Sequence, residues 1–79
     1  MEPRCEETTG LFIEGLALAG LVKSFRIEKE KKYALVVVET LRGELFCARI
    51  PIEAVEKTKT LLEYYTNLYA MMKGITSER

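Results

Sequence analysis

The feature that most constrains this chain is a long segment without glycine or proline, which starts directly after Pro51 and stops before Gly74. Apolar residues recur in it at intervals of three and four, which is the spacing of one face of an α-helix. Proline suits the first turn of a helix, where its missing N–H is not needed. The segment therefore predicts one long amphipathic helix over about residues 52–73.

The apolar residues of this predicted helix cover more of its circumference than one sheet face needs. Val55 and Leu62 mark the main stripe, and further residues extend it to a second side. A small chain gains core by pairing with a copy of itself, so we expect a homodimer with this helix at the interface. The alternative is that residues 10–20 fold over the second side. The residues expected at the dimer interface are Leu61, Tyr64, Tyr65, Leu68, Met71 and Met72.

Ahead of the helix, alternation of side chains predicts β-strands over about residues 21–28, 33–40 and 44–50. The second of these, YALVVVET, is rich in β-branched residues and apolar on both faces, as expected of a central strand. Three glycines between residues 10 and 20 argue against a helix interior. We therefore predict a further strand over about residues 11–18.

The polar first residues, 1–9, are predicted to form a flexible leader, and residues 10–79 a single domain. The expected fold class is α+β: an antiparallel meander of three to four strands followed by one long C-terminal amphipathic helix. Residues 41–43 are predicted to form a tight connection between the last two strands, in which Gly43 is able to take a positive φ.

Positive charge gathers in the middle third of a chain whose net charge is zero. In an antiparallel meander, Arg26 and Arg49 can reach the same sheet face. Cations along a phosphate backbone, with aromatic rings for base stacking, are typical of single-strand binding. Glutamates in the same region dilute this charge, and lysine-rich turns also protect sheet edges from aggregation. The candidate nucleic-acid-binding residues are Lys23, Arg26, Lys31, Lys32, Tyr33, Arg42 and Arg49.

The predicted meander ends in a proline and continues into a helix, an order of elements that resembles a known family. It is carried by the run YALVVVET, LRG, ELFCARIP and IEAVEKTKTLLEYYTNLYAMM. Over about residues 20–74 the chain resembles the core of the transcriptional coactivator positive cofactor four and the related Whirly proteins. The resemblance implies a sheet followed by a helix, pairing of helices into a dimer, and a curved sheet surface for single-stranded DNA. It implies that the residues facing the nucleic acid are Lys23, Arg26, Tyr33, Arg42 and Arg49.

The residue inventory leaves little for catalysis or metal binding. The chain contains neither His nor Asp, and it shows neither a nucleophile elbow nor a phosphate-binding loop. Cys5 and Cys47 are far apart and lack a histidine to complete a zinc site. A buried free thiol at Cys47 is the simpler interpretation, and a Cys5–Cys47 disulfide is the alternative. We therefore expect no enzyme, no metal and no cofactor.

The start of the chain is acidic and polar, unlike a signal peptide, and the apolar run LFIEGLALAGLV is shorter than the ~20 residues that span a bilayer. We expect a cytoplasmic protein without a membrane partner. Few amide side chains with many Glu and Lys are typical of hot environments, which indicates a thermophilic source. The expected function is that of a homodimer that binds single-stranded DNA or RNA through a basic sheet face. The alternative is a homodimeric protein–protein interaction module of a thermophile or of its virus or mobile element, without nucleic-acid binding.

Overall fold

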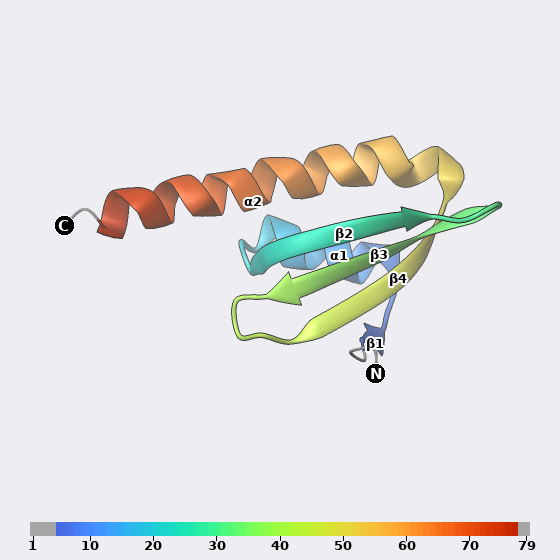
Figure 1. Ribbon diagram of the computed structural model, residues 1–79, viewed down its shortest axis with the longest axis horizontal. Coiled ribbons are helices and arrows are strands. Elements are labelled where there is room, and N and C mark those ends of the chain that lie inside the picture. The colour runs from blue at the N-terminus through green and yellow to red at the C-terminus, as the bar shows by residue number, and fades with distance from the viewer. Residues whose placement is uncertain (1–4, 78–79) are drawn as a thin grey trace.

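In the computed structural model, two helices lie on one face of a four-stranded sheet (Figure 1). The backbone of residues 5–77 is described, with the side chains of residues 5–68 and 71. The sheet has the strand order β1-β4-β3-β2. Along the chain the elements are β1 (Glu6–Glu7), α1 (Gly10–Leu18), β2 (Val22–Lys29), β3 (Tyr33–Thr40), β4 (Leu45–Pro51), the 3-10 helix η1 (Ile52–Ala54) and α2 (Val55–Ser77).

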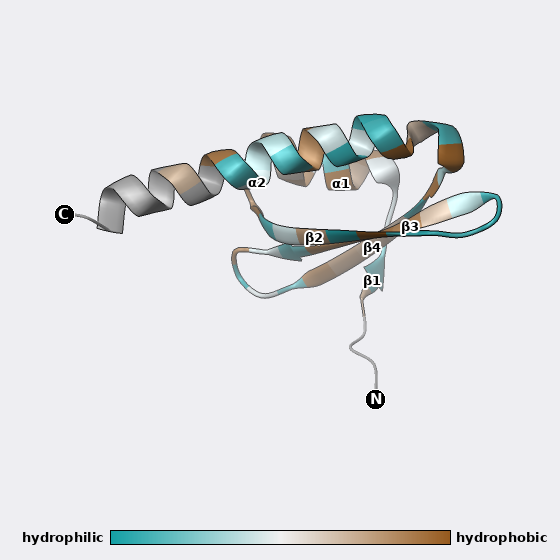
Figure 2. Ribbon diagram, turned by 45° about the horizontal axis from the view of Figure 1, so that its top comes forward, coloured by the Kyte–Doolittle hydropathy of each residue, from teal (hydrophilic) through white to brown (hydrophobic). Residues whose placement is uncertain are grey.

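The strand register decides which side chains lie on each face of the sheet. β2, β3 and β4 are antiparallel neighbours, with Val36 opposite both Ile27 and Ala48. Successive side chains alternate between faces, so these three share one face, which both helices cover (Figure 2). Val37 and its neighbour Arg26 lie on the other side. This second side, which neither α1 nor α2 covers, is the open face.

One hydrophobic core lies between the helix layer and the covered face of the sheet. Leu62 of α2 and Ile13 of α1 are fully buried in it, and both helices and the three long strands contribute to it. Its buried members are Ile13, Ala17, Val22, Ala34, Val36, Val38, Ala48, Ile50, Val55 and Leu62. Burying one such aliphatic side chain is favourable by roughly 1.5–3 kcal/mol, so the sheet depends on the helices that cover it.

The strand predicted over residues 11–18 is wrong, because this segment forms helix α1. The Thr9 hydroxyl accepts a hydrogen bond from the Phe12 N–H at 3.1 Å, which caps the first turn. Gly20 adopts a φ of 74° and ends the helix in the left-handed conformation that glycine tolerates. Only Gly15 lies in the helix interior, where glycine costs about 1 kcal/mol relative to alanine.

A strand pair and a disulfide join the first described residues to the sheet. β1 lies parallel to β4, and Cys5 is bonded to Cys47 of β4. For the described part of residues 1–9, the prediction of a flexible leader is therefore wrong. The interpretation of Cys47 as a free thiol is also wrong, because Cys47 is bonded to Cys5. Residues 1–4 lie outside the described part of the chain.

The α+β class and the C-terminal helix are confirmed, but the sheet is mixed and not the antiparallel meander that we predicted. The difference comes from β1, which is parallel to its neighbour β4. The other three strands are antiparallel, and each lies within one residue of its predicted bounds. Gly43 turns between β3 and β4 with a φ of 89°, as expected. The predicted helix over residues 52–73 starts as η1 and continues as α2 to Ser77.

Helix α2 is longer than the sheet beneath it. Its 23 residues rise over about 35 Å. Its C-terminal part extends past the N-terminal end of β2 (Figure 1). The radius of gyration is 13.0 Å. A compact domain of this length has a radius of roughly 11.6 Å. The excess agrees with a helix that projects from the body of the molecule.

Replacing Leu62 tests the single core. Leu62 has no exposed surface, whereas Leu11 on α1 is 80% exposed. We expect Leu62→Ala to lower the free energy of unfolding by about 2–5 kcal/mol, because it leaves a cavity among buried side chains. The matched change Leu11→Ala should alter it by less than about 0.5 kcal/mol. Urea unfolding followed by circular dichroism measures both, and equal losses would contradict the assignment of Leu62 to the core.

Reduction tests the link between the first residues and β4. Cys5 and Cys47 are separated by 42 positions. Closing a loop of that length stabilises a fold by about 4 kcal/mol in the chain-entropy description. We expect a reductant to lower the midpoint of thermal unfolding of the native chain, and to have no effect on the double variant Cys5→Ser/Cys47→Ser. Two reactive thiols in the unreduced, denatured protein would show that the bond is not formed.

Candidate functional site

The open face brings together three of the residues predicted to bind nucleic acid. Arg26 on β2 and Arg49 on β4 lie on this face, with side chains 67% and 60% exposed. Tyr33 begins β3, and the Arg49 guanidinium lies over its ring, with Cζ 5.4 Å from the ring centroid. The two arginines therefore share a face, as the alternation of an antiparallel meander predicts, and one of them is next to an aromatic ring.

Each of these guanidinium groups has a carboxylate partner. Arg26 Nε lies 3.1 Å from Glu28 Oε2, and Arg49 Nη1 lies 3.8 Å from Glu7 Oε2. The register places Glu39 on the same face. Exposed ion pairs of this kind contribute about 0–1 kcal/mol each, so a phosphate backbone can compete for the arginines. The nearby carboxylates nevertheless remove the excess of positive charge that is typical of a nucleic-acid-binding face.

The other four predicted nucleic-acid-binding residues are spread along the sheet. Lys31 and Lys32 lie in the β2–β3 turn, at the end of the sheet where Tyr33 begins β3. Arg42 lies in the β3–β4 turn at the opposite end, a strand length of roughly 26 Å away. Lys23 lies at a break in the register near the start of β2. These four residues and the two arginines therefore form no single compact patch.

The centre of the open face is apolar. Leu35 and Val37 of β3 and Leu45 of β4 are half-buried there, and their partners across the strands include Arg49 and Glu39. Large apolar side chains surrounded by charged ones resemble the anatomy of a protein interface, with its apolar centre and polar rim.

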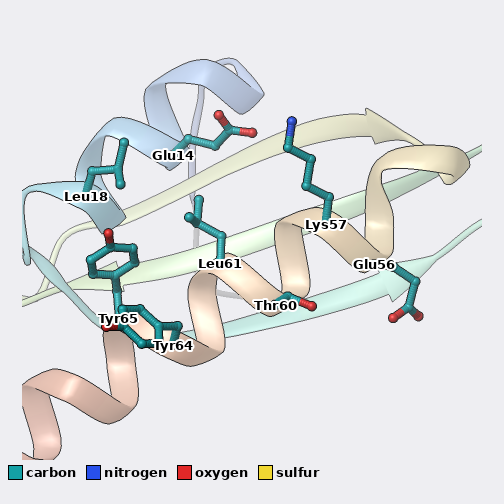
Figure 3. Close-up of a pocket in the computed structure, with 8 residues that line it drawn as sticks. All are labelled: Glu14, Leu18, Glu56, Lys57, Thr60, Leu61, Tyr64 and Tyr65. Carbon is teal, nitrogen blue, oxygen red and sulfur yellow. The ribbon is translucent and has the colours of Figure 1, made fainter.

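A second surface lies between α1 and α2, where the side chains line a groove of about 650 Å³ (Figure 3). Figure 3 shows Leu18 of α1 across from Leu61 and Tyr65 of α2. The rings of Tyr64 and Tyr65 pack edge to face, with centroids 4.9 Å apart. The groove is lined by Glu14, Leu18, Glu56, Lys57, Thr60, Leu61, Tyr64 and Tyr65.

Three of the residues predicted at the dimer interface, Leu61, Tyr64 and Tyr65, line this groove. Leu68 and Met71 follow along α2 and are also exposed. The side chain of Met72 lies outside the described residues. Helix α1 packs beside α2, as the alternative for residues 10–20 requires. It leaves Tyr64 61% and Met71 64% exposed, so it covers only part of the second side of α2.

Sequence reasoning missed Glu14 and Leu18 as groove residues, because it placed them on a strand. A threonine cap at Thr9 and a glycine terminator at Gly20 bracket this segment, and that pair of signals indicates a short helix. The contact between Glu7 and Arg49 was also missed, since it depends on the pairing of β1 with β4.

Comparisons with known proteins find no match: no family model, no curated protein and no solved structure is significantly similar to this chain. The resemblance to positive cofactor four and the Whirly proteins therefore stays a prediction. In the part of the chain that the structure describes, no helix is both long and apolar enough to cross a membrane. The same part has no group of three or more cysteine, aspartate or glutamate side chains placed to hold a metal ion.

Proposed function

We propose that this protein is a homodimeric protein-interaction module, which pairs through α2 and presents the open face of its sheet to a second protein. The observation that carries the proposal is the second side of α2. There Tyr64, Leu68 and Met71 are exposed in a row that leads out of an apolar groove. Large apolar side chains gathered on one exposed surface mark interaction sites in soluble proteins. The proposal includes no catalytic activity, because the chain has neither His nor Asp for acid–base chemistry.

The open face supports a protein as the second partner. Leu35, Val37 and Leu45 offer an apolar centre, and the ion pairs of Arg26 and Arg49 offer a charged rim. Arginine is enriched at protein interfaces, where its planar group forms hydrogen bonds to carboxylates and packs on aromatic rings. Tyr33 and Arg49 already form such a contact within the chain.

The Cys5–Cys47 disulfide limits the cellular environments in which the protein can function. Disulfides persist in oxidising compartments and also inside hyperthermophiles, whose intracellular proteins are rich in them. Asn67 is the only amide side chain of this sequence, which favours the second setting, because asparagine and glutamine are thermolabile. We therefore propose a cytoplasmic protein of a thermophile, or of a virus or mobile element that lives in one.

Sedimentation of matched tyrosine variants tests the homodimer. One chain has a mass of 9.0 kDa, and we expect the native protein at tens of micromolar to sediment with twice that mass. Tyr64→Lys places a charge on the exposed side of α2 and should return the protein to a monomer with unchanged circular dichroism. The same exchange at Tyr33, on the open face, should leave the dimer intact.

The opposite result, with Tyr33→Lys monomeric and Tyr64→Lys dimeric, would move the pairing to the sheet and contradict the proposal. A native chain that sediments as a monomer would contradict it as well.

A second candidate function is binding of single-stranded nucleic acid through the open face. The contact of Arg49 with Tyr33 favours it, because a guanidinium beside an exposed ring provides both a phosphate ligand and a stacking platform. Arg26 lies on the same face and can bind the backbone farther along. Most of the affinity would come from these backbone contacts, with little sequence preference.

Fluorescence anisotropy with a labelled oligonucleotide tests this second function. We expect Arg26→Ala/Arg49→Ala to weaken binding and to make the slope of log affinity against log salt shallower by about 0.7 for each phosphate that the variant no longer binds. Glu7→Gln/Glu28→Gln should strengthen binding, because it releases both arginines from their partners. The control Lys57→Ala/Lys59→Ala removes the same charge from α2 and should retain more affinity than the arginine variant. Binding that is absent at low salt, or unchanged in the arginine variant, would exclude this function.

A further inference from the structure

Helix α2 carries two stripes that face different directions. Val55, Thr58 and Leu62 are buried in the direction of the sheet. A separate row, which we name the outer seam, consists of Lys57, Leu61, Tyr64, Leu68 and Met71. Its members are spaced by four, three, four and three residues, which is the spacing of the contact positions in a coiled coil. The spacing of the outer seam suits packing against another helix, and the sheet covers the other stripe.

The two halves of the outer seam have different surroundings. Lys57, Leu61 and Tyr64 line the groove that α1 forms with α2, and Leu18 makes the opposite wall (Figure 3). Leu68 and Met71 follow farther along the helix, in the direction in which α2 projects past the sheet (Figure 1). The same helix thus presents an open, mostly apolar groove and, farther along, exposed apolar side chains.

We propose that the groove between α1 and α2 receives the projecting part of α2 from a second copy of the chain, with the two α2 helices antiparallel. This inference rests on the proposed homodimer and specifies its geometry. A two-fold axis near Thr66 fills both grooves at once. It places Leu61 against Met71 of the partner subunit, and Tyr64 against Leu68 of the partner subunit. The projecting part of α2 in each copy then covers the groove of the other copy.

Charge along the outer seam favours the antiparallel direction. In a parallel, in-register pair, the two Lys57 side chains would meet across the seam, and like charges in contact are unfavourable. In the antiparallel pair they lie about 27 Å apart along the helix axis. That is beyond the ~8–10 Å over which charges act in physiological salt. The flanking positions Thr60 and Asn67 are uncharged, so no repulsion arises at that edge of the seam.

The need to fill the groove also favours antiparallel helices. A parallel pair would lay the two projecting segments side by side and leave the grooves facing one another. The antiparallel pair lays residues 67–77 of one copy along residues 55–65 of the other, which is the stretch of α2 that lines the groove.

The free edge of the sheet is a poorer site for a second copy. β2 is the edge strand, and its register is broken between Val22 and Ser24. Lys23 lies at this break, and Lys29 ends the strand. Bulges and lysines on edge strands oppose pairing with another chain. The helix groove is therefore the better surface for self-association.

Cross-linking of single-cysteine variants tests the proposed geometry. The cross-linker is a short bismaleimide, which reacts with free thiols and leaves the Cys5–Cys47 disulfide intact. We expect an equal mixture of Leu61→Cys and Met71→Cys chains, one of them tagged to change its size, to give mainly the mixed covalent dimer. Either variant alone should give much less product, because each residue lies about 15 Å along the helix axis from its own copy, and the native chain should give none. A mixture of Tyr64→Cys and Leu68→Cys chains should also give the mixed dimer, although these residues lie only about 6 Å from their own copies and should self-link as well.

Sedimentation of the same samples separates the two proposals. Strong self-linking of Leu61→Cys alone and of Met71→Cys alone in a dimer would indicate parallel helices and overturn this inference while leaving the homodimer. A dimer that links in neither mixture would place the interface elsewhere, with the same consequence. A monomer would overturn both proposals. Both proposals would also be overturned if native mass spectrometry showed a monomer with a copurified small amphiphile bound in the groove.

Discussion

The structure depends on one constraint: both helices must cover the same face of the sheet. Ala34, Val36 and Val38 of β3 are fully buried on that face, and only α1 and α2 together bury them. Once both helices lie there, the opposite face of the sheet is left open. Helix α1 also takes the place beside α2 and forms the groove. The open face and the groove, which are the two candidate surfaces, thus follow from how the core is closed.

The long helix and the three antiparallel strands could be predicted because their signals are local. Side-chain alternation in residues 21–28, the β-branched residues of 33–40 and helical spacing after Pro51 are local signals that the final fold preserves. Helix α1 was missed because a count of glycines ignored their positions, although Thr9 and Gly20 mark its two ends. The Cys5–Cys47 disulfide was only the alternative interpretation, because the sequence does not show the parallel pairing that brings together segments 42 positions apart.

The candidate site was predictable in part, for the same reason. That Arg26 and Arg49 share a face follows from strand alternation, but their ion pairs with Glu28 and Glu7 do not. The apolar breadth of α2 was visible in the sequence. The sequence did not show which side chains of α2 contact the sheet and which lie on the outer seam. That division depends on the packing of α1 against one side of α2. Tertiary packing therefore separates two stripes that the sequence presents as one.

The pairing of β1 with β4 has a consequence for how the sheet ends. A sheet normally has two borders at which further strands can add, and here β1 and its disulfide block part of the border on the β4 side. Reduction of the disulfide would leave only the two-residue pairing of β1 with β4 to cover that border. In a reducing solution, a released N-terminal segment would leave backbone groups of β4 without partners beside Cys47. Chains could then stack edge to edge, in assemblies unrelated to the helices.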